Sequence, residues 1–340
     1  MGVANSTNNQ LTYQIDDLKL TDAVETTNWG NLPFEMKEMV VRRMDIVTRT
    51  CLKLCSKADK YLVESTPVHF MKVEAVSDDT AISTGANLRF AVDNVKFEQN
   101  GANLTIFRNG KEKRITMENG EKTYDLTLEY FKSIVFEGKV RIDECSITRL
   151  EYPPIACTPT TLIKVKKLDG VFMRADDCYK WLQHFAPNVS ELSLMCCDRF
   201  SRCRRKILML PVVMNARKIT IECCEIDNED IQYLRATDIR IVFSSVGNYG
   251  LKKLIKKWMD DDYPKIGSSI KIENTNAIVR HRDVPINIAK LINKSKECEE
   301  IYAKNKAYTL VLPIKNKKFM ILTDNNTDIH IYIAAKCPYC

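Results

Sequence analysis

The second half of the chain repeats one apolar spacing, in which two aliphatic residues separated by one position are followed three positions later by a small residue. The pattern starts as Val189-x-x-Leu192-x-Leu194-x-x-Cys197 and returns in 216–224, 236–244 and 267–275. Short alternation of this kind predicts strands, and the spacing between the copies predicts helices over 176–185, 228–234 and 249–261. A strand and helix pair cannot bury its apolar faces alone, so the copies are expected to stack in parallel into one curved sheet. We therefore predict a leucine-rich-like array over 136–275, irregular because the distance between copies varies.

The segments on either side of this array favour antiparallel strands. Over 67–135, alternating runs are interrupted by Asn100-Gly101 and Asn109-Gly110, and Asn-Gly pairs are strong hairpin signals. A helix is expected near 124–134. Over 276–340, the pattern predicts a helix around 286–304 and then strands at 308–314, 318–323 and 329–334 that close the array. The predicted fold class is α+β or α/β, with a terminal β-meander.

Residues 29–66 have the pattern of three short helices, preceded by a flexible tail, 1–28, that is rich in Asn, Thr, Ser and Asp. Pro33 is expected at the first helical position, where its missing N–H costs nothing. Ser56 and Asp59 have the spacing of a capping box, with Asp in place of Glu, and predict the start of the last helix. So short a segment makes too small a core to be stable alone.

One face of the first of these helices is apolar. Met36, Val40, Met44 and Val47 recur at helical spacing, and Met39 widens the stripe. Such a face must be buried against something. Two alternatives follow: the helices cap the next domain of the same chain, or they bind another protein.

This segment resembles an F-box, in particular the F-box that begins a large class of nematode F-box proteins. In that family, the corresponding positions grip a Skp-type adaptor, which links the protein to a cullin scaffold of a ubiquitin ligase. The resemblance therefore implies an adaptor-binding surface here. Many F-boxes place a Trp after the Cys-Ser-Lys run, whereas this chain has Ala58 and Asp59. The resemblance is carried by Glu35 and by the residues implied to bind the adaptor: Leu32, Pro33, Met36, Val40, Met44, Leu52, Cys55, Ser56 and Lys57.

A second resemblance covers 176–275, which is similar to the FTH domain that follows the F-box in many nematode proteins. It is carried by Phe185-Ala-Pro-Asn-Val-Ser-Glu-Leu192, by Asp238 to Ser245, and by Leu254 to Met259 followed by Ile270-Lys-Ile272. In that family, the domain is taken as the substrate-facing half. The resemblance implies that the array binds a target protein.

The cysteines and histidines do not form a metal-binding pattern. Thirteen cysteines are scattered along the chain with four histidines, and the only Cys-x-x-Cys is Cys337 to Cys340. The N-terminus lacks a signal-peptide pattern, and no apolar run is long enough to span a membrane. We therefore expect a chain of the cytoplasm or nucleus with reduced thiols, no metal, no cofactor and no membrane contact.

The charge is mild but locally concentrated. The net charge of +7 does not by itself indicate a nucleic-acid partner. A loop with Arg199, Arg202, Arg204 and Arg205 is a candidate target-binding site, because guanidinium groups pair bidentately with carboxylates and phosphates. The lysines of 252–257 are more simply a solvated helix face.

The sequence carries none of the common catalytic signatures, such as a glycine-rich phosphate loop, a nucleophile elbow or a His-Glu-x-x-His zinc motif. We therefore predict a non-catalytic substrate receptor of a Skp–cullin–F-box ubiquitin ligase, binding the adaptor through 29–66 and an unknown target through the array. The alternative is a solenoid that binds nucleic acid or an acidic or phosphorylated ligand, with the N-terminal helices as a cap.

Overall fold

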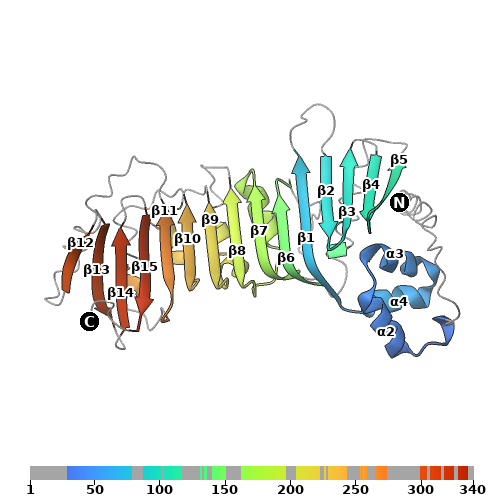
Figure 1. Cartoon of the computed structure of the whole chain (residues 1–340), viewed down its shortest axis with the longest axis horizontal. Coiled ribbons are helices and arrows are strands. Elements are labelled where there is room, and N and C mark those ends of the chain that lie inside the picture. Colours follow the sequence, from blue (N-terminus) through green and yellow to red (C-terminus); the bar gives the residue numbers. More distant parts are fainter. Residues whose placement is uncertain are drawn as a thin grey trace. The chain divides into compact units, whose positions relative to one another are not determined.

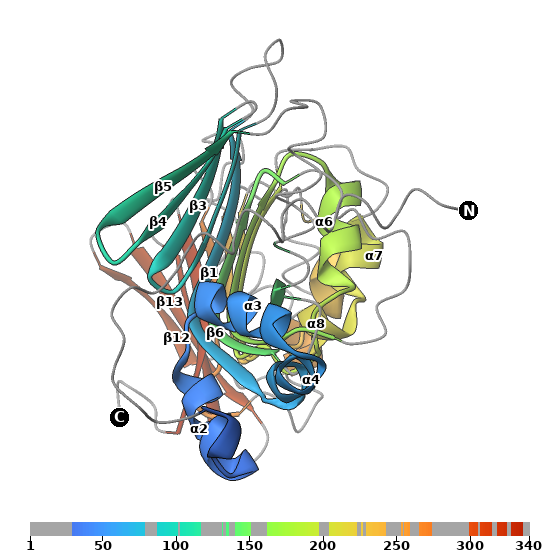
Figure 2. The ribbon, with the colours of Figure 1, turned by 90° about the vertical axis from the view of Figure 1, so that its right-hand side faces the viewer.

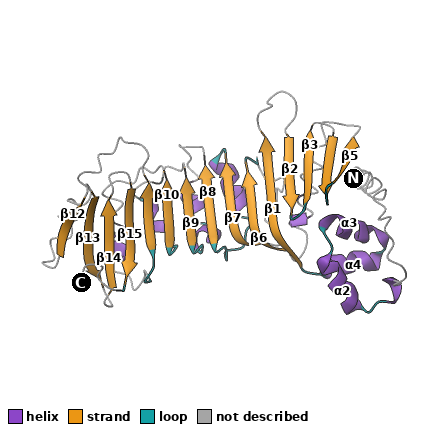
Figure 3. Ribbon diagram, in the orientation of Figure 1, coloured by secondary structure: helices purple, strands orange, loops and turns teal. Residues whose placement is uncertain are grey.

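The computed structural model divides the chain into two compact units. The first comprises Met1–Ser146 with Pro154–Lys164, and the second Ile147–Pro153 with Val165–Cys340. The residues that the structure describes are 29–78, 87–100, 103–116, 131, 134–135, 140–150, 162–196, 204–222, 226, 229–242, 253, 255–258, 265–273, 299–304, 307–314, 318–324 and 328–335. Broadly, the fold is α+β, with N-terminal helices followed by a large β-sheet region (Figure 3).

The N-terminal helices of the first unit form as predicted. A 3₁₀ turn, η1 (Trp29–Asn31), precedes α2 (Phe34–Arg43), α3 (Ile46–Cys55) and α4 (Lys57–Ser65). Side chains cap the last two: the Asp45 carboxylate accepts from the Thr48 N–H, and the Ser56 hydroxyl accepts from the Asp59 N–H. The three α-helices share a small core of Val41, Leu62 and Val63, against which Trp29, Met44 and Leu52 pack.

Three local details of these helices differ from the prediction. The predicted apolar stripe is shorter, because α2 ends at Arg43: Met44 is its C-cap, and Val47 lies buried in α3. Pro33 is the N-cap of α2 and not its first helical residue, because its ψ of 151° leaves it extended while its carbonyl already accepts from the Lys37 N–H. The sequence also favours a break over 45–50 before the second helix, whereas Asp45 caps a helix that already begins at Ile46. A strong N-cap can start a helix without a longer loop.

The sheet of the first unit is antiparallel in its hairpins, as the Asn-Gly turns predict. Its strands lie in the order β6-β1-β2-β3-β4-β5. Asn109 and Gly110 turn between β4 and β5 with φ of 50° and 74°, the left-handed conformation that suits these residues. On the buried face, Phe90 stacks on Phe97 of the adjacent strand at 4.3 Å between ring centroids. The strands are β1 (Val68–Asp78), β2 (Asn87–Val92), β3 (Val95–Asn100), β4 (Asn103–Arg108), β5 (Lys111–Thr116) and β6 (Val140–Thr148).

The second unit holds a parallel ladder that confirms the predicted pairing of the repeated segments (Figure 1). Leu192 pairs with Ile219, Ile219 with Ile239, and Ile239 with Ile270, so equivalent residues of the four copies align across the sheet. The strand that precedes the four copies places Leu168 opposite Leu192. The strands are β7 (Lys164–Phe172), β8 (Glu191–Cys196), β9 (Lys218–Glu222), β10 (Asp238–Val242) and β11 (Ser269–Glu273).

Helices cover one face of this ladder, which is why its burial alternates. Figure 2 shows α6 (Ala175–Leu182), α7 (Arg204–Leu208) and α8 (Pro211–Met214) on the same side of the strands. The predicted helix over 228–234 is the shorter 3₁₀ turn η3 (Asp230–Tyr233). Apolar residues such as Ile219 and Ile241 are buried, whereas the residues between them, such as Thr220 and Arg240, reach solvent.

An antiparallel meander ends the second unit, with β15 (Asp328–Ala334) pairing antiparallel with β11. The expected helix over 286–304 is wrong at its end, because 299–304 is the strand β12 (Glu299–Lys304) and pairs with β13 (Ala307–Ile314). Ladder hydrogen bonds to a neighbouring strand outweigh helix propensity there. The remaining strand is β14 (Lys318–Asp324), and the order is β11-β15-β14-β13-β12.

Several expectations fall outside the described residues. These are the tail 1–28, most of the helices near 124–134 and 249–261, the segment 286–298, and the C-terminal Cys337 to Cys340.

Candidate functional site

An apolar face on α2 is left uncovered by the rest of the described chain. Met36, Met39 and Val40 lie at i, i+3 and i+4 of this helix and are 51%, 57% and 41% exposed. Val41, on the opposite face, is 0% exposed and fills the helical core. The helix therefore uses one residue to pack inward and presents its methionines and Val40 outward.

The residues expected to bind an adaptor divide into an exposed and a packed group. Met44 and Leu52 are half-buried and pack against the Val41, Leu62 and Val63 core. Leu32 is half-buried as well. The exposed group consists of Pro33, Met36, Val40, Cys55, Ser56 and Lys57.

A hydrogen bond across 30 positions of sequence joins the two segments that flank these residues. The Trp29 indole Nε1–H donates to Oδ1 of Asp59 at 2.7 Å. The other carboxylate oxygen, Oδ2, accepts from the Ser56 hydroxyl at 2.7 Å. Asp59 therefore ties the turn before Leu32 to the start of α4, where Ser56 caps the helix.

Lys37 adds a cation to this group. Its Nζ lies 5.8 Å from the centroid of the Trp29 ring and donates to the Gly30 carbonyl at 3.2 Å. The hydrogen bonds from Ser56 and Trp29, with the charge of Lys37, lower the pKa of Asp59 against the opposing effect of desolvation. The carboxylate is therefore held in its ionised form.

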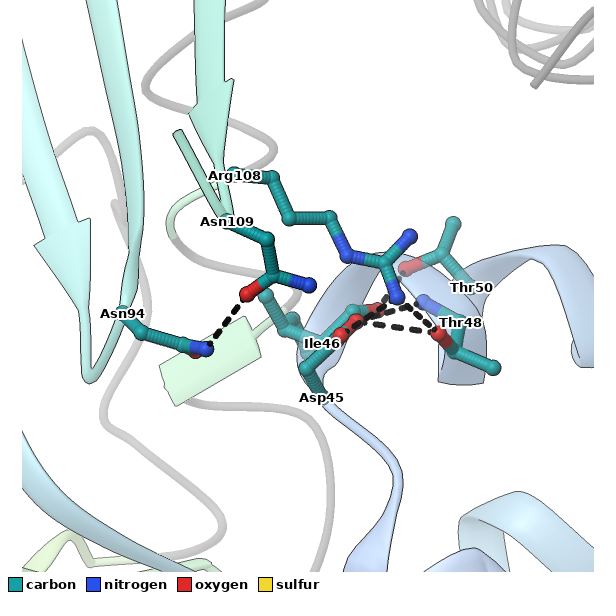
Figure 4. Close-up of polar contacts among 7 residues, drawn as sticks. All are labelled: Asp45, Ile46, Thr48, Thr50, Asn94, Arg108 and Asn109. Atoms are coloured by element: carbon teal, nitrogen blue, oxygen red, sulfur yellow. Dashed lines mark hydrogen bonds and ion pairs between the residues drawn. The ribbon is translucent and has the colours of Figure 1, made fainter. Parts of the chain in front are cut away.

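A second polar junction joins α3 to the hairpin of β4 and β5 (Figure 4). Arg108, the last residue of β4, donates from Nη2 to the Thr48 hydroxyl at 2.7 Å and forms an ion pair with Asp45. Asn94 donates to Asn109 at 3.2 Å and links the two neighbouring turns of the sheet. The helical segment is thus attached to the following sheet through the cap of α3.

Sequence reasoning missed Trp29, Phe34 and Arg108. Phe34 is 50% exposed at the start of α2. Trp29 had a signal, because it lies three positions before Leu32 in the run that leads into the first predicted helix. Arg108 had none, since its partner is 63 positions away and no local pattern connects them.

The candidate arginine site is only partly described, and the part described is not a loop. Arg199 and Arg202 fall outside the described residues, whereas Arg204 and Arg205 lie in α7. Arg205 pairs with Glu229 at 3.2 Å, and its guanidinium lies 5.8 Å from the centroid of the Tyr233 ring. The Arg205 fork is therefore engaged within the second unit.

Among the residues that the structure describes, no α-helix combines the length and apolar content needed to cross a membrane. In the same ranges, no three or more His, Cys, Asp or Glu side chains gather in a metal-binding arrangement.

Comparison with protein families identifies residues 29–71 as an F-box domain. The matched residues run from η1 through the helices into the first strand, and they include the exposed face of α2. F-box domains bind Skp-type adaptors within cullin complexes, and F-box proteins are in general non-catalytic, substrate-recognition or adaptor subunits of these ubiquitin ligases. No curated protein and no solved structure matched the chain.

Proposed function

We propose that this chain is a non-catalytic substrate receptor of a Skp–cullin–F-box ubiquitin ligase. Its F-box domain would hold a Skp-type adaptor through the exposed face of α2 and the turn between α3 and α4. The observation that carries the proposal is the exposure of Met36, Met39 and Val40 within the matched F-box. Fully burying a free side chain of this kind is worth about 1.5–3 kcal/mol, and these three are about half exposed, so covering each would contribute roughly half of that value.

The surroundings of this face suit a protein interface. Charged residues border the apolar stripe, and Glu38 and Arg42 already pair with each other at 2.7 Å on the adjoining side of α2. Apolar anchors surrounded by a polar rim are typical of specific interfaces. Pro33 and Lys57 would lie at the edges of the contact.

For the target, we propose the second unit as a leucine-rich-like interaction domain of the FTH type. The support is the alignment of Leu192, Ile219, Ile239 and Ile270 in one parallel ladder. The helices cover the apolar face of that ladder, so its other face remains for polar contacts. Residues on this other face stand in register across the strands: Asp169, Ser193, Thr220, Arg240, Lys271 and His330.

Such a receptor would act by position. Holding a target near a ubiquitin-charged enzyme raises the effective concentration of the reacting groups, and this requires no catalytic residue in the receptor. The two units would then have separate tasks, adaptor binding in the first and target binding in the second.

A capture assay with a purified Skp-type adaptor tests the adaptor half of the proposal. We expect the unmodified chain to be captured and Met36→Asp to reduce capture at least tenfold, because a carboxylate would be desolvated in an apolar contact. Met209→Asp is the matched control, since Met209 is 52% exposed in the second unit while Met36 is 51% exposed. Absence of capture by the unmodified chain, or equal capture of both variants, would overturn the proposal.

A further inference from the structure

We propose that Trp29 and Asp59 are positioning residues for the adaptor surface, holding the Leu32-Pro33 turn against the start of α4 so that both present one surface. This inference rests on the proposed function, because it concerns how the F-box keeps its contact residues in place. Neither residue belongs to the exposed apolar stripe. Their effect on adaptor binding would pass through Leu32, Pro33 and Ser56.

The geometry leaves Asp59 fully engaged. One carboxylate oxygen accepts from the Trp29 indole at 2.7 Å and the other from the Ser56 hydroxyl at 2.7 Å. The Asp59 backbone N–H returns a hydrogen bond to the same hydroxyl at 3.0 Å. Hydrogen bonds to an ionised acceptor are about twice as strong as neutral ones, so this closed set fixes Trp29 relative to α4.

Trp29 in turn fixes the approach to α2. The Leu32 N–H donates to the Trp29 carbonyl at 3.3 Å, which places Leu32 one short turn after the anchored indole. The Trp29 ring packs on the Val41, Leu62 and Val63 core, and Lys37 holds Gly30 from α2. The segment that enters α2 is therefore held from both α2 and α4.

A segment before α2 that is held by a hydrogen bond differs from one that is held by packing alone. Packing of the ring alone would leave the indole free to rotate and the Leu32-Pro33 turn free to shift over the core. The hydrogen bond to Asp59 fixes the orientation of the indole. Replacing Trp29 with Phe removes that donor while keeping most of the apolar contact, which separates positioning from packing.

The test measures adaptor affinity and unfolding free energy for the full chain in parallel. We expect Trp29→Phe and Asp59→Ala each to weaken adaptor binding about tenfold, which corresponds to about 1.4 kcal/mol. The double variant should lose no more than either single variant, because both remove the same contact. Asp59→Asn, which keeps an oxygen acceptor for the indole, should retain more affinity than Asp59→Ala.

Val41→Ala provides the control for destabilisation, because it weakens the core on which Trp29 packs but leaves both partners of the Trp29–Asp59 hydrogen bond in the chain. The positioning role is wrong if Trp29→Phe costs no more affinity than Val41→Ala at equal loss of stability. It is also wrong if the affinity losses of Trp29→Phe and Asp59→Ala add up in the double variant. Failure of the proposed function has a different signature. In that case, the unmodified chain does not capture the adaptor and Met36→Asp changes nothing.

Discussion

Nη2 of Arg108 lies 2.5 Å from Oδ2 of Asp45, joining the end of β4 to the N-cap of α3 (Figure 4). The other oxygen of Asp45 accepts from the Thr48 N–H at 2.9 Å, so one carboxylate serves both the helix cap and the contact with the sheet. The side chains of Arg108 and Asp45 are only 23% and 19% exposed. Partial burial reduces solvent screening and strengthens the pair.

Replacing Arg108 with Ala should therefore destabilise the first unit by about 1–2 kcal/mol, a value above that of fully exposed pairs. The measurement is urea unfolding of the full chain, monitored through a spectroscopic signal of the helices. Arg114→Ala is the control, because Arg114 pairs with Glu112 on the exposed strand β5 with 68% of its side chain in solvent. Its effect is expected to be below about 0.5 kcal/mol. Equal effects of the two substitutions would show that the Asp45 contact adds nothing.

The neighbours Val40 and Val41 should separate stability from binding. Val41→Ala is expected to lower the free energy of unfolding by about 1.5–3 kcal/mol, since Val41 is fully buried in a small core. Val40→Ala should leave stability within about 0.5 kcal/mol, because this side chain is exposed. At a temperature where both variants are folded, Val40→Ala should weaken adaptor capture more than Val41→Ala does. A Val40→Ala variant as unstable as Val41→Ala would contradict the assigned faces of α2.

Arg49 is a buried cation whose replacement should stabilise the chain. It lies in α3 with 2% exposure, and its three guanidinium nitrogens have no acceptor in the described part of the chain. Desolvation lowers the pKa of Arg49 to about 10. Arg49→Met keeps the side-chain length and removes the buried charge, so the free energy of unfolding should rise by about 1–3 kcal/mol. Thermal or urea unfolding measures the effect. Arg43→Met, on the exposed side of α2, is the control and should change stability little. A loss of stability in Arg49→Met would refute the expectation.

Glu273 should make the stability of the second unit dependent on pH. Hydrogen bonds from Arg240 and then Lys271 lower the pKa of Glu273 from 4.5 to about 2. Because the folded-state value is the lower one, the stabilisation is fully present above the unfolded pKa and is lost as pH falls toward about 2. The difference in urea midpoint between the unmodified chain and Glu273→Gln should therefore shrink between about pH 5 and about pH 3. Glu191→Gln, at an exposed position on the same sheet, is the control, and a difference that stays constant with pH would be inconsistent with this linkage.

Much of the local structure could be predicted because its causes lie within a few residues. The Asn109-Gly110 turn, the Ser56 cap and the alternation around Ile219 and Ile239 each depend on neighbouring side chains. The predicted helix end at 299–304 failed because its outcome depends on pairing with β13, which no local pattern records. Arg205 was similarly expected to be available, but its charge partners, Glu229 and Asp230, come from a different part of the chain.

The candidate site divides in the same way. The sequence by itself determined that α2 would be amphipathic, with Met36 and Val40 on one stripe, because helical spacing follows from the order of residues. Only the tertiary structure decided that Val41 faces the core and leaves this stripe exposed. It also decided that Asp45 meets Arg108 and that Asp59 meets Trp29. These choices depend on which surfaces and charges come together when distant segments pack, and the free energy of such contacts is absent from any short stretch of sequence.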